Sequence, residues 1–216
     1  MKRLIPFLII CAFATTAKAQ VPFFGTSPGK NNIYNYTQLE FSPGHDAQSI
    51  FIFTHYGITD RFSAGVEFSS GPGILRQGFN LKLQFVKQDY LNASVQVSTC
   101  FNLFDSYRFD HQNISLFTNG HIVSGLGYIT NTYCNVNREG DWSANQYWYL
   151  TYALGKVTPF VGMTHSWTQP FEPDLTLGLG FSLGNVGLYA WSGSLFSGAP
   201  VFTVGFDYQF GSKSAH

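Results

Sequence analysis

The fold is decided by the stretch Gln77-Gly-Phe-Asn-Leu-Lys-Leu-Gln-Phe-Val86, a turn at Lys87-Gln88-Asp89, and Tyr90-Leu-Asn-Ala-Ser-Val-Gln-Val-Ser-Thr-Cys-Phe-Asn102. Apolar and polar residues alternate on both sides of the turn. Because successive side chains of a strand point to opposite faces, this stretch predicts a hairpin with one apolar and one polar face. The apolar face carries Phe79, Leu81, Leu83, Phe85, Leu91, Ala93, Val95 and Val97.

A soluble β-sandwich and a membrane β-barrel can both contain such a hairpin. Three features favour the barrel: the strands are long, the chain starts with a secretory signal, and the alternation recurs as far as the last strand, 201–210. We therefore predict an all-β fold, a transmembrane antiparallel up-and-down β-barrel with lipid outside and a polar lumen.

The first nineteen residues have the pattern of a signal peptide. Basic residues Lys2 and Arg3 precede an apolar run from Leu4 to Phe13, and Ala17-Lys18-Ala19 provides a small-x-small cleavage site before Gln20. The apolar run is shorter than the ~20 residues that a spanning helix needs. We predict secretion, cleavage near Ala19 and a final location in the outer membrane.

The composition excludes several classes of protein. Without Lys2, Arg3 and Lys18, nine basic residues face twelve acidic ones, so the mature chain lacks the basic surface of a nucleic-acid-binding protein. Charged residues make up 11% of the chain and aromatic residues 18%, which is unusual for a soluble surface. After the signal peptide, no apolar run reaches the ~20 residues that a spanning helix needs. A closed barrel is then the remaining way to satisfy the backbone hydrogen bonds of such a chain in lipid.

Turn signals divide the chain into twelve predicted strands, with ten as the alternative count. Short turns near Gly57, Lys87, Asn119, Lys156 and Gly184 alternate with longer connections after Ser42, Gly71, Leu103, Asn135, Thr168 and Phe196, as in bacterial outer-membrane barrels. The hairpin turn at Asn119-Gly120 suits a primed turn. The domain division is a signal peptide (1–19), a periplasmic tail or small plug (20–32), the barrel (33–210) and a C-terminal tail (211–216).

Aromatic residues are predicted to form a girdle at each membrane interface. Tyrosine and phenylalanine residues such as Tyr56 and Phe85 cluster at the predicted periplasmic ends. The four tryptophans fall at or toward the predicted outer ends: Trp142, Trp148, Trp167 and Trp191.

The whole mature chain resembles Gram-negative outer-membrane β-barrel proteins. Its last strand, Val201-Phe-Thr-Val-Gly-Phe-Asp-Tyr-Gln-Phe210, is similar to the C-terminal signal read by the barrel assembly machinery, although six residues follow the terminal Phe. The residues that carry this signal are Phe202, Phe206, Tyr208 and Phe210. The hairpin Tyr56-Gly-Ile-Thr-Asp-Arg-Phe-Ser-Ala-Gly-Val66 is also similar to one in transporters of the phenol meta-pathway type. The resemblance implies partners: outer-membrane lipid and the assembly machinery.

Polar side chains on the predicted inner faces are candidates for a pore constriction. Pairing around the Gly71 loop is expected to place Lys82 diagonally opposite Glu67. The two charges would either set a transverse field that selects small polar solutes or form a salt bridge that plugs a narrow barrel. The full candidate set is Glu67, Arg76, Lys82, Asp207, Asn80, Gln84 and Gln96.

The sequence predicts no enzyme, metal or cofactor. His165 and Ser166 are adjacent, so in a strand they point to opposite faces and cannot act together as base and nucleophile. His55, His111 and His121 have no evident partner, and no His or Cys pair has metal-ligand spacing. Cys100 and Cys134 are either a disulfide or two separate thiols.

We predict a passive pore or transporter for small solutes, with hydrophobic solutes as one candidate class. The alternatives are a closed barrel that works through its outer loops, 103–110 and 135–144, and a lipid-modifying enzyme. Truncating these loops tests the first alternative, and a phospholipase or deacylase assay with alanine at His55 or His165 tests the second.

Overall fold

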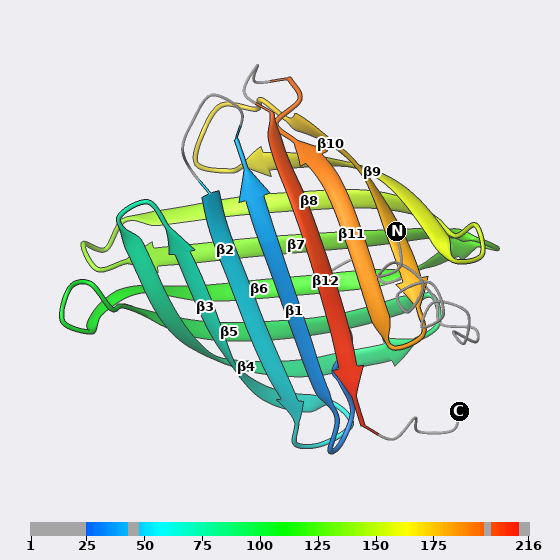
Figure 1. Cartoon of the computed structure of the whole chain (residues 1–216), viewed down its shortest axis with the longest axis horizontal. Coiled ribbons are helices and arrows are strands. Elements are labelled where there is room, and N and C mark those ends of the chain that lie inside the picture. The colour runs from blue at the N-terminus through cyan, green and yellow to red at the C-terminus, as the bar shows by residue number, and fades with distance from the viewer. Residues whose placement is uncertain (1–24, 43–47, 197–199, 212–216) are drawn as a thin grey trace, which may run out of the picture.

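The computed structural model describes residues 25–42, 48–196 and 200–211, and within them the chain forms a closed barrel of twelve antiparallel strands. Each strand pairs with its neighbours in sequence, and β1 closes the barrel against β12 (Figure 1). The signal peptide lies outside the described residues. The strands are β1 (Ile33–Phe41), β2 (Gln48–Gly57), β3 (Phe62–Gly71), β4 (Ile74–Gln88), β5 (Leu91–Asn102), β6 (Arg108–Val123), β7 (Leu126–Asn137), β8 (Trp142–Tyr152), β9 (Val157–Ser166), β10 (Asp174–Leu183), β11 (Val186–Gly193) and β12 (Val201–Phe210).

The predicted alternation is present in the central hairpin. On β4, Leu81 is 54% exposed on the outer surface, while Asn80 and Gln84 on the inner face are 2% and 1% exposed. Apolar side chains on the outside and polar ones inside suit a barrel with a lipid-facing exterior. The structure thus confirms the all-β, twelve-stranded fold.

Closure removes the free strand edges that a flat sheet would leave. The β1–β12 pairing runs without a break from Ile33 opposite Phe210 to Phe41 opposite Phe202. A closed barrel pairs its backbone groups between strands, which is required where no water can bind them. Among the described residues, no helix is long and apolar enough to cross a membrane.

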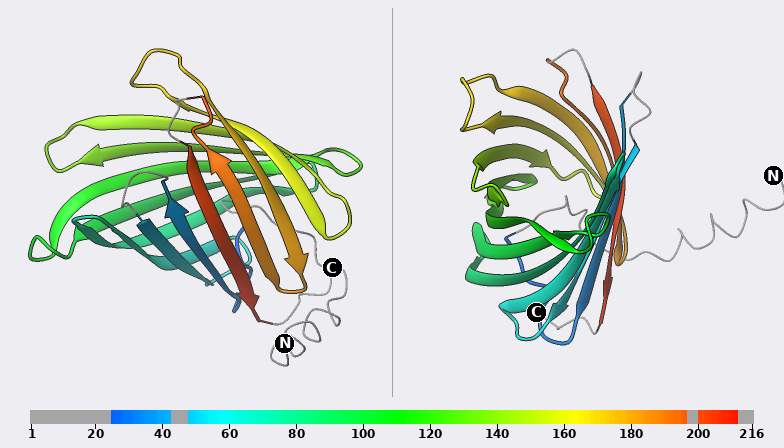
Figure 2. Two further views of the ribbon diagram at one scale, coloured as in Figure 1. Left: turned by 45° about the horizontal axis from the view of Figure 1, so that its top comes forward. Right: turned by 90° about the vertical axis from the view of Figure 1, so that its left-hand side faces the viewer.

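The barrel has two unlike ends. The turn end holds Ile33, Phe210 and the connections 58–61, 89–90, 124–125, 153–156 and 184–185. The loop end holds the opposite ends of all strands and includes the longer connections 103–107 and 167–173. Strands β1, β2 and β12 form one wall, and β5 to β8 form the wall opposite (Figures 1 and 2).

Three connections differ from their predictions. Asn119 and Gly120 lie inside β6, and the turn is formed by residues 124–125, where Gly125 has a positive φ of 77°. A Cβ at Gly120 would lie 1.9 Å from the Tyr90 carbonyl oxygen, so glycine serves a close backbone approach there. Residues 72–73 join β3 to β4 as a tight turn instead of a long loop, and residues 89–90 replace the predicted turn at 87–89.

Candidate functional site: the barrel lumen

Three adjacent cavities occupy the lumen. The mouth cavity, about 620 Å³, lies at the loop end, the middle cavity of about 370 Å³ lies below it, and the inner cavity of about 360 Å³ reaches toward the turn end. Asn135 lines both the mouth and the middle cavity, and Phe51, Asn113 and Tyr133 line both the middle and the inner cavity. His111 lines both the mouth and the inner cavity, so each of the three cavities adjoins the other two along the barrel.

Charged side chains dominate the mouth cavity. Arg76 Nε lies 2.7 Å from Asp110 Oδ2, and the same oxygen lies 2.6 Å from His111 Nδ1. Nearer the surface, Arg138 Nη1 lies 3.2 Å from Asp105 Oδ2. The entrance thus carries both signs of charge in close pairs.

Residues 25–32 bound the inner cavity at the turn end. Thr26, Ser27 and Pro28 belong to its lining. The segment is held from inside the barrel by three hydrogen bonds: the Gly25 N–H donates to Asn119 Oδ1 (2.8 Å), the Ser27 N–H donates to Gln84 Oε1 (3.1 Å), and Gln209 Nε2 donates to the Pro28 carbonyl (3.1 Å).

The end of this segment is fixed to Gly57, the last residue of β2. The Asn31 N–H donates to the Gly57 carbonyl and the Gly57 N–H donates to the Asn32 carbonyl, both at 2.8 Å. A Cβ at Gly57 would lie 1.7 Å from the Gly29 carbonyl oxygen, so only glycine permits this contact. The segment therefore narrows the turn end by specific contacts.

Aromatic rings cover two facing parts of the lumen. One group, which we call the β1–β2 rings, contains Tyr34, Tyr36, Phe51 and Phe53, with centroid distances of 5.6–5.9 Å. The other group lies mainly on the opposite wall, with neighbouring centroids 5.4–6.5 Å apart. These β6–β11 rings are Phe117, Tyr133, Tyr147, Tyr149, Phe160 and Trp191.

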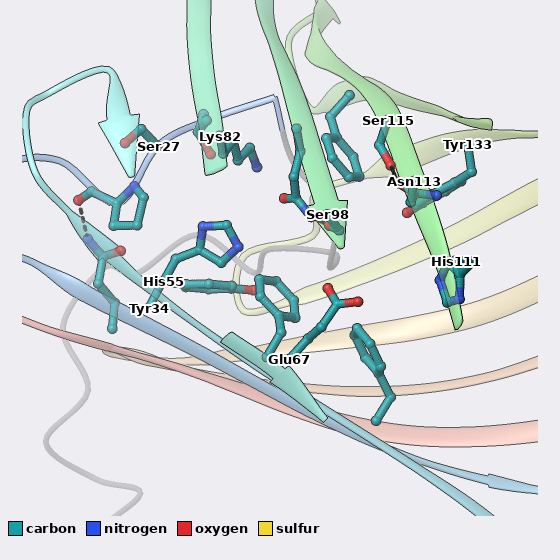
Figure 3. Close-up of a pocket in the computed structure, with 17 residues that line it drawn as sticks. Ser27, Tyr34, His55, Glu67, Lys82, Ser98, His111, Asn113, Ser115 and Tyr133 are labelled. Atoms are coloured by element: carbon teal, nitrogen blue, oxygen red, sulfur yellow. Dashed lines mark hydrogen bonds between the residues drawn. The ribbon is translucent and has the colours of Figure 1, made fainter. Parts of the chain in front are cut away.

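The structure distributes four of the predicted candidates between two cavities. Glu67, Lys82 and Gln96 line the inner cavity, and Arg76 lines the mouth cavity. Figure 3 shows Tyr34, His55 and Glu67 on one side of the inner cavity and Lys82, Ser98 and Ser115 on the other.

The predicted diagonal between Lys82 and Glu67 is wrong. Lys82 is paired with Ser63, and Glu67 is paired with Gly78, so Asn80 lies between them on β4. The tight 72–73 turn sets this register, because no loop residues remain to shift β4 along β3. Glu67 instead accepts hydrogen bonds from Asn80 Nδ2 (3.1 Å) and Cys100 Sγ (3.0 Å).

The remaining candidates belong to the wall. Asp207 is buried and accepts hydrogen bonds from the Tyr34 hydroxyl (3.0 Å), the Tyr189 hydroxyl (2.6 Å) and the Gly187 N–H (2.8 Å). Gln84 also donates to Asn92 Oδ1 (3.0 Å). The bonds to the Asp207 carboxylate are charge-assisted, so they are stronger than neutral ones and fix the strands that carry them.

Sequence reasoning missed the lumen aromatics. Trp191 was assigned to the outer girdle, but on β11 it alternates with outward Leu188 and Ala190 and lines the middle cavity, 6.5 Å from Phe160. The sequence contains a signal for lumen aromatics in β2. Phe51 and Phe53 alternate with apolar Ile50 and Ile52, so this strand has apolar side chains on both faces and one set must face the lumen.

The structure gives two of the histidines a partner and decides between the two alternatives for the cysteines. His55 Nδ1 lies 3.1 Å from Ser63 Oγ, so His55 does have a partner, but Ser63 is fully buried and does not line a cavity that a substrate could enter. Cys100 and Cys134 are separate thiols. Within the described ranges, no three His, Cys, Asp or Glu residues are grouped as metal ligands.

The comparisons with known proteins show the fold of outer-membrane porins. The KdgM porin superposes with a TM-score of 0.65 at 11% sequence identity, covering 82% of this chain and 99% of the porin. The NanC porin gives 0.58 at 11% identity with 81% and 98% covered, and Omp33 of Acinetobacter baumannii gives 0.53 at 6% identity with 85% and 100% covered. No family model and no curated protein matches the chain.

Proposed function

We propose that this protein is an outer-membrane channel through which small solutes diffuse passively. The observation that carries the proposal is the series of mouth, middle and inner cavities along a lumen with polar and aromatic walls, inside a barrel whose outer face is apolar. The turn end would face the periplasm and the loop end the outside, as in other outer-membrane barrels. The porin fold of the structural neighbours supports this assignment.

The outward side chains of β12 support an assembly role for the last strand. Phe202, Phe206 and Phe210 are all exposed on the outer surface, and Tyr208 is half-buried. We propose that the barrel assembly machinery reads this strand and that lipid then covers it.

Within the lumen, Glu67, Lys82 and Gln96 are the proposed selectivity residues. Glu67 and Lys82 come from the neighbouring strands β3 and β4 and lie on different sides of the inner cavity (Figure 3). Opposite charges placed in this way create a field across a narrow passage, which favours small polar solutes. Hydrophobic solutes remain a second class to be tested, because aromatic rings supply much of the lining.

Conductance in planar lipid bilayers tests the proposal. Purified protein is expected to give discrete current steps, and detergent alone should give none. Lys82→Ala should shift the channel toward cations, because the lining of the inner cavity then loses a positive charge and keeps the negative charge of Glu67. Complete absence of ion flux and of solute-driven liposome swelling would reject the channel.

A further inference from the structure

The middle and inner cavities have an unusual combination of lining groups. Aromatic rings lie beside primary amides, and the amides belong to Gln38, Gln96, Asn113, Asn131, Asn135, Asn145 and Gln209. An amide can both donate and accept hydrogen bonds, as a hydroxyl group can. Aromatic rings offer flat apolar faces with negative charge density. Together these groups match a molecule that has C–H faces and a rim of hydroxyls.

We propose that the central lumen binds an uncharged, hydroxyl-rich ring solute, a neutral saccharide, between its two groups of aromatic rings. The inference rests on the proposed channel and names its solute class. Phe51 from the β1–β2 rings lines the same middle cavity as Tyr147, Tyr149 and Trp191 from the β6–β11 rings. A sugar ring entering this cavity meets aromatic side chains from both groups.

Charge argues against an acidic solute. Glu40 is the only charged residue in the lining of the middle cavity, and Glu67 lines the inner cavity together with Lys82. Glu40 already accepts hydrogen bonds from Gln38 Nε2 and Ser49 Oγ, both at 2.7 Å. A second carboxylate brought to this site would meet like charge, which costs binding energy.

The amides also argue against a purely apolar solute. Such a molecule would displace water from the amide groups without replacing its hydrogen bonds, and this costs affinity. Each of the two cavities lies within the range of about 300–1,000 Å³ that is usual for small-molecule sites. Both cavities share Phe51, Asn113 and Tyr133, so a chain of two or three sugar rings could extend through them.

Trp191 provides a binding signal that needs no ion flux. It lies in the middle cavity, and the other three tryptophans lie outside the middle and inner cavities. A variant with Trp142→Phe, Trp148→Phe and Trp167→Phe, folded in lipid nanodiscs, leaves Trp191 as the single reporter. Maltotriose, trigalacturonate, phenol and choline are then titrated separately.

We expect maltotriose to change Trp191 emission saturably and to half-saturate at the lowest concentration of the four probes. Tyr147→Ala should raise that concentration by up to about ten-fold through loss of a stacking face. Tyr147→Phe keeps the ring and should stay near the parent value. Phe79→Ala removes an outward-facing ring and is the matched control.

Each other outcome overturns the inference. Tighter binding of trigalacturonate would mean an acidic saccharide site, tighter binding of phenol an apolar site, and tighter binding of choline a cation site. No response to any probe would mean that the lumen has no solute site. A barrel that conducts ions but fails this titration loses only the saccharide proposal, whereas one that binds maltotriose but carries no current loses only the channel.

Discussion

The two ends of the lumen are built in opposite ways. At the loop end, the mouth cavity is wide and carries paired charges such as Arg76 and Asp110. At the turn end, residues 25–32 cross the lumen and are hydrogen-bonded to Gln84, Asn119 and Gln209. We therefore expect the paired charges of the mouth to contribute to ion selectivity beside Glu67 and Lys82, and residues 25–32 to limit the width of the passage at the turn end.

Removing most of the segment 25–32 at the turn end should change single-channel conductance more than any other change considered below changes its own readout. Deletion of residues 21–28 takes away Thr26, Ser27 and Pro28 from the lining of the inner cavity and is expected to raise single-channel conductance several-fold. Gln84→Ala removes one anchor of the segment and should give a smaller rise. Equal conductance in the deletion and the parent would show that the segment does not limit the passage.

Removal of a charge from the barrel wall should lower the free energy of unfolding far more than removal of a charge from the mouth. Asp207→Ala leaves the hydroxyls of Tyr34 and Tyr189 and the Gly187 N–H without their acceptor, and each hydrogen bond to a charged group contributes about 1.5–3 kcal/mol. Arg138→Ala breaks a half-exposed ion pair and should cost less than about 1 kcal/mol. Urea unfolding in lipid vesicles measures the free energy of unfolding of both variants. Similar losses of stability in the two variants would contradict the expected difference between wall and mouth.

A smaller effect is expected for ion selectivity at the mouth. Arg76→Ala leaves Asp110 without its arginine and should increase the permeability of cations relative to anions, most clearly at low salt. Arg61→Ala, an exposed arginine at the turn end, is the matched control. Reversal potentials in a salt gradient give the ratio, and an equal shift in both variants would remove the distinction between the two ends.

The alternation of side chains made the fold readable from the sequence. Phe79, Leu81 and Leu83 face outward as predicted, because a period of two fixes direction once a strand is assigned. The same rule placed Arg76, Lys82 and Gln96 at the lumen. It could not give the register between strands, because the register depends on the length of the turn that joins them. With the tight 72–73 turn, Glu67 lies opposite Gly78 and Lys82 lies opposite Ser63, so the two charges are not neighbours.

Groups that depend on several strands were also hidden from sequence reasoning. The acceptor role of Asp207 requires Tyr34 from β1 and Tyr189 from β11, and the aromatic lining requires residues from both walls. Asn119-Gly120 looked like a turn because local propensity favours one there. Tertiary contact with Tyr90 and Gly25 decides otherwise.

Cysteine accessibility combined with conductance tests the channel most directly. In a background with Cys100→Ser and Cys134→Ser, Gln96→Cys places a thiol in the inner cavity, and Leu81→Cys places one on the outer surface of the same barrel. A charged, water-soluble thiol reagent added during recording should reduce the current through Gln96→Cys channels and leave Leu81→Cys channels unchanged. Unchanged current at Gln96→Cys despite complete labelling, or an equal reduction at both positions, would contradict a water-filled conducting lumen.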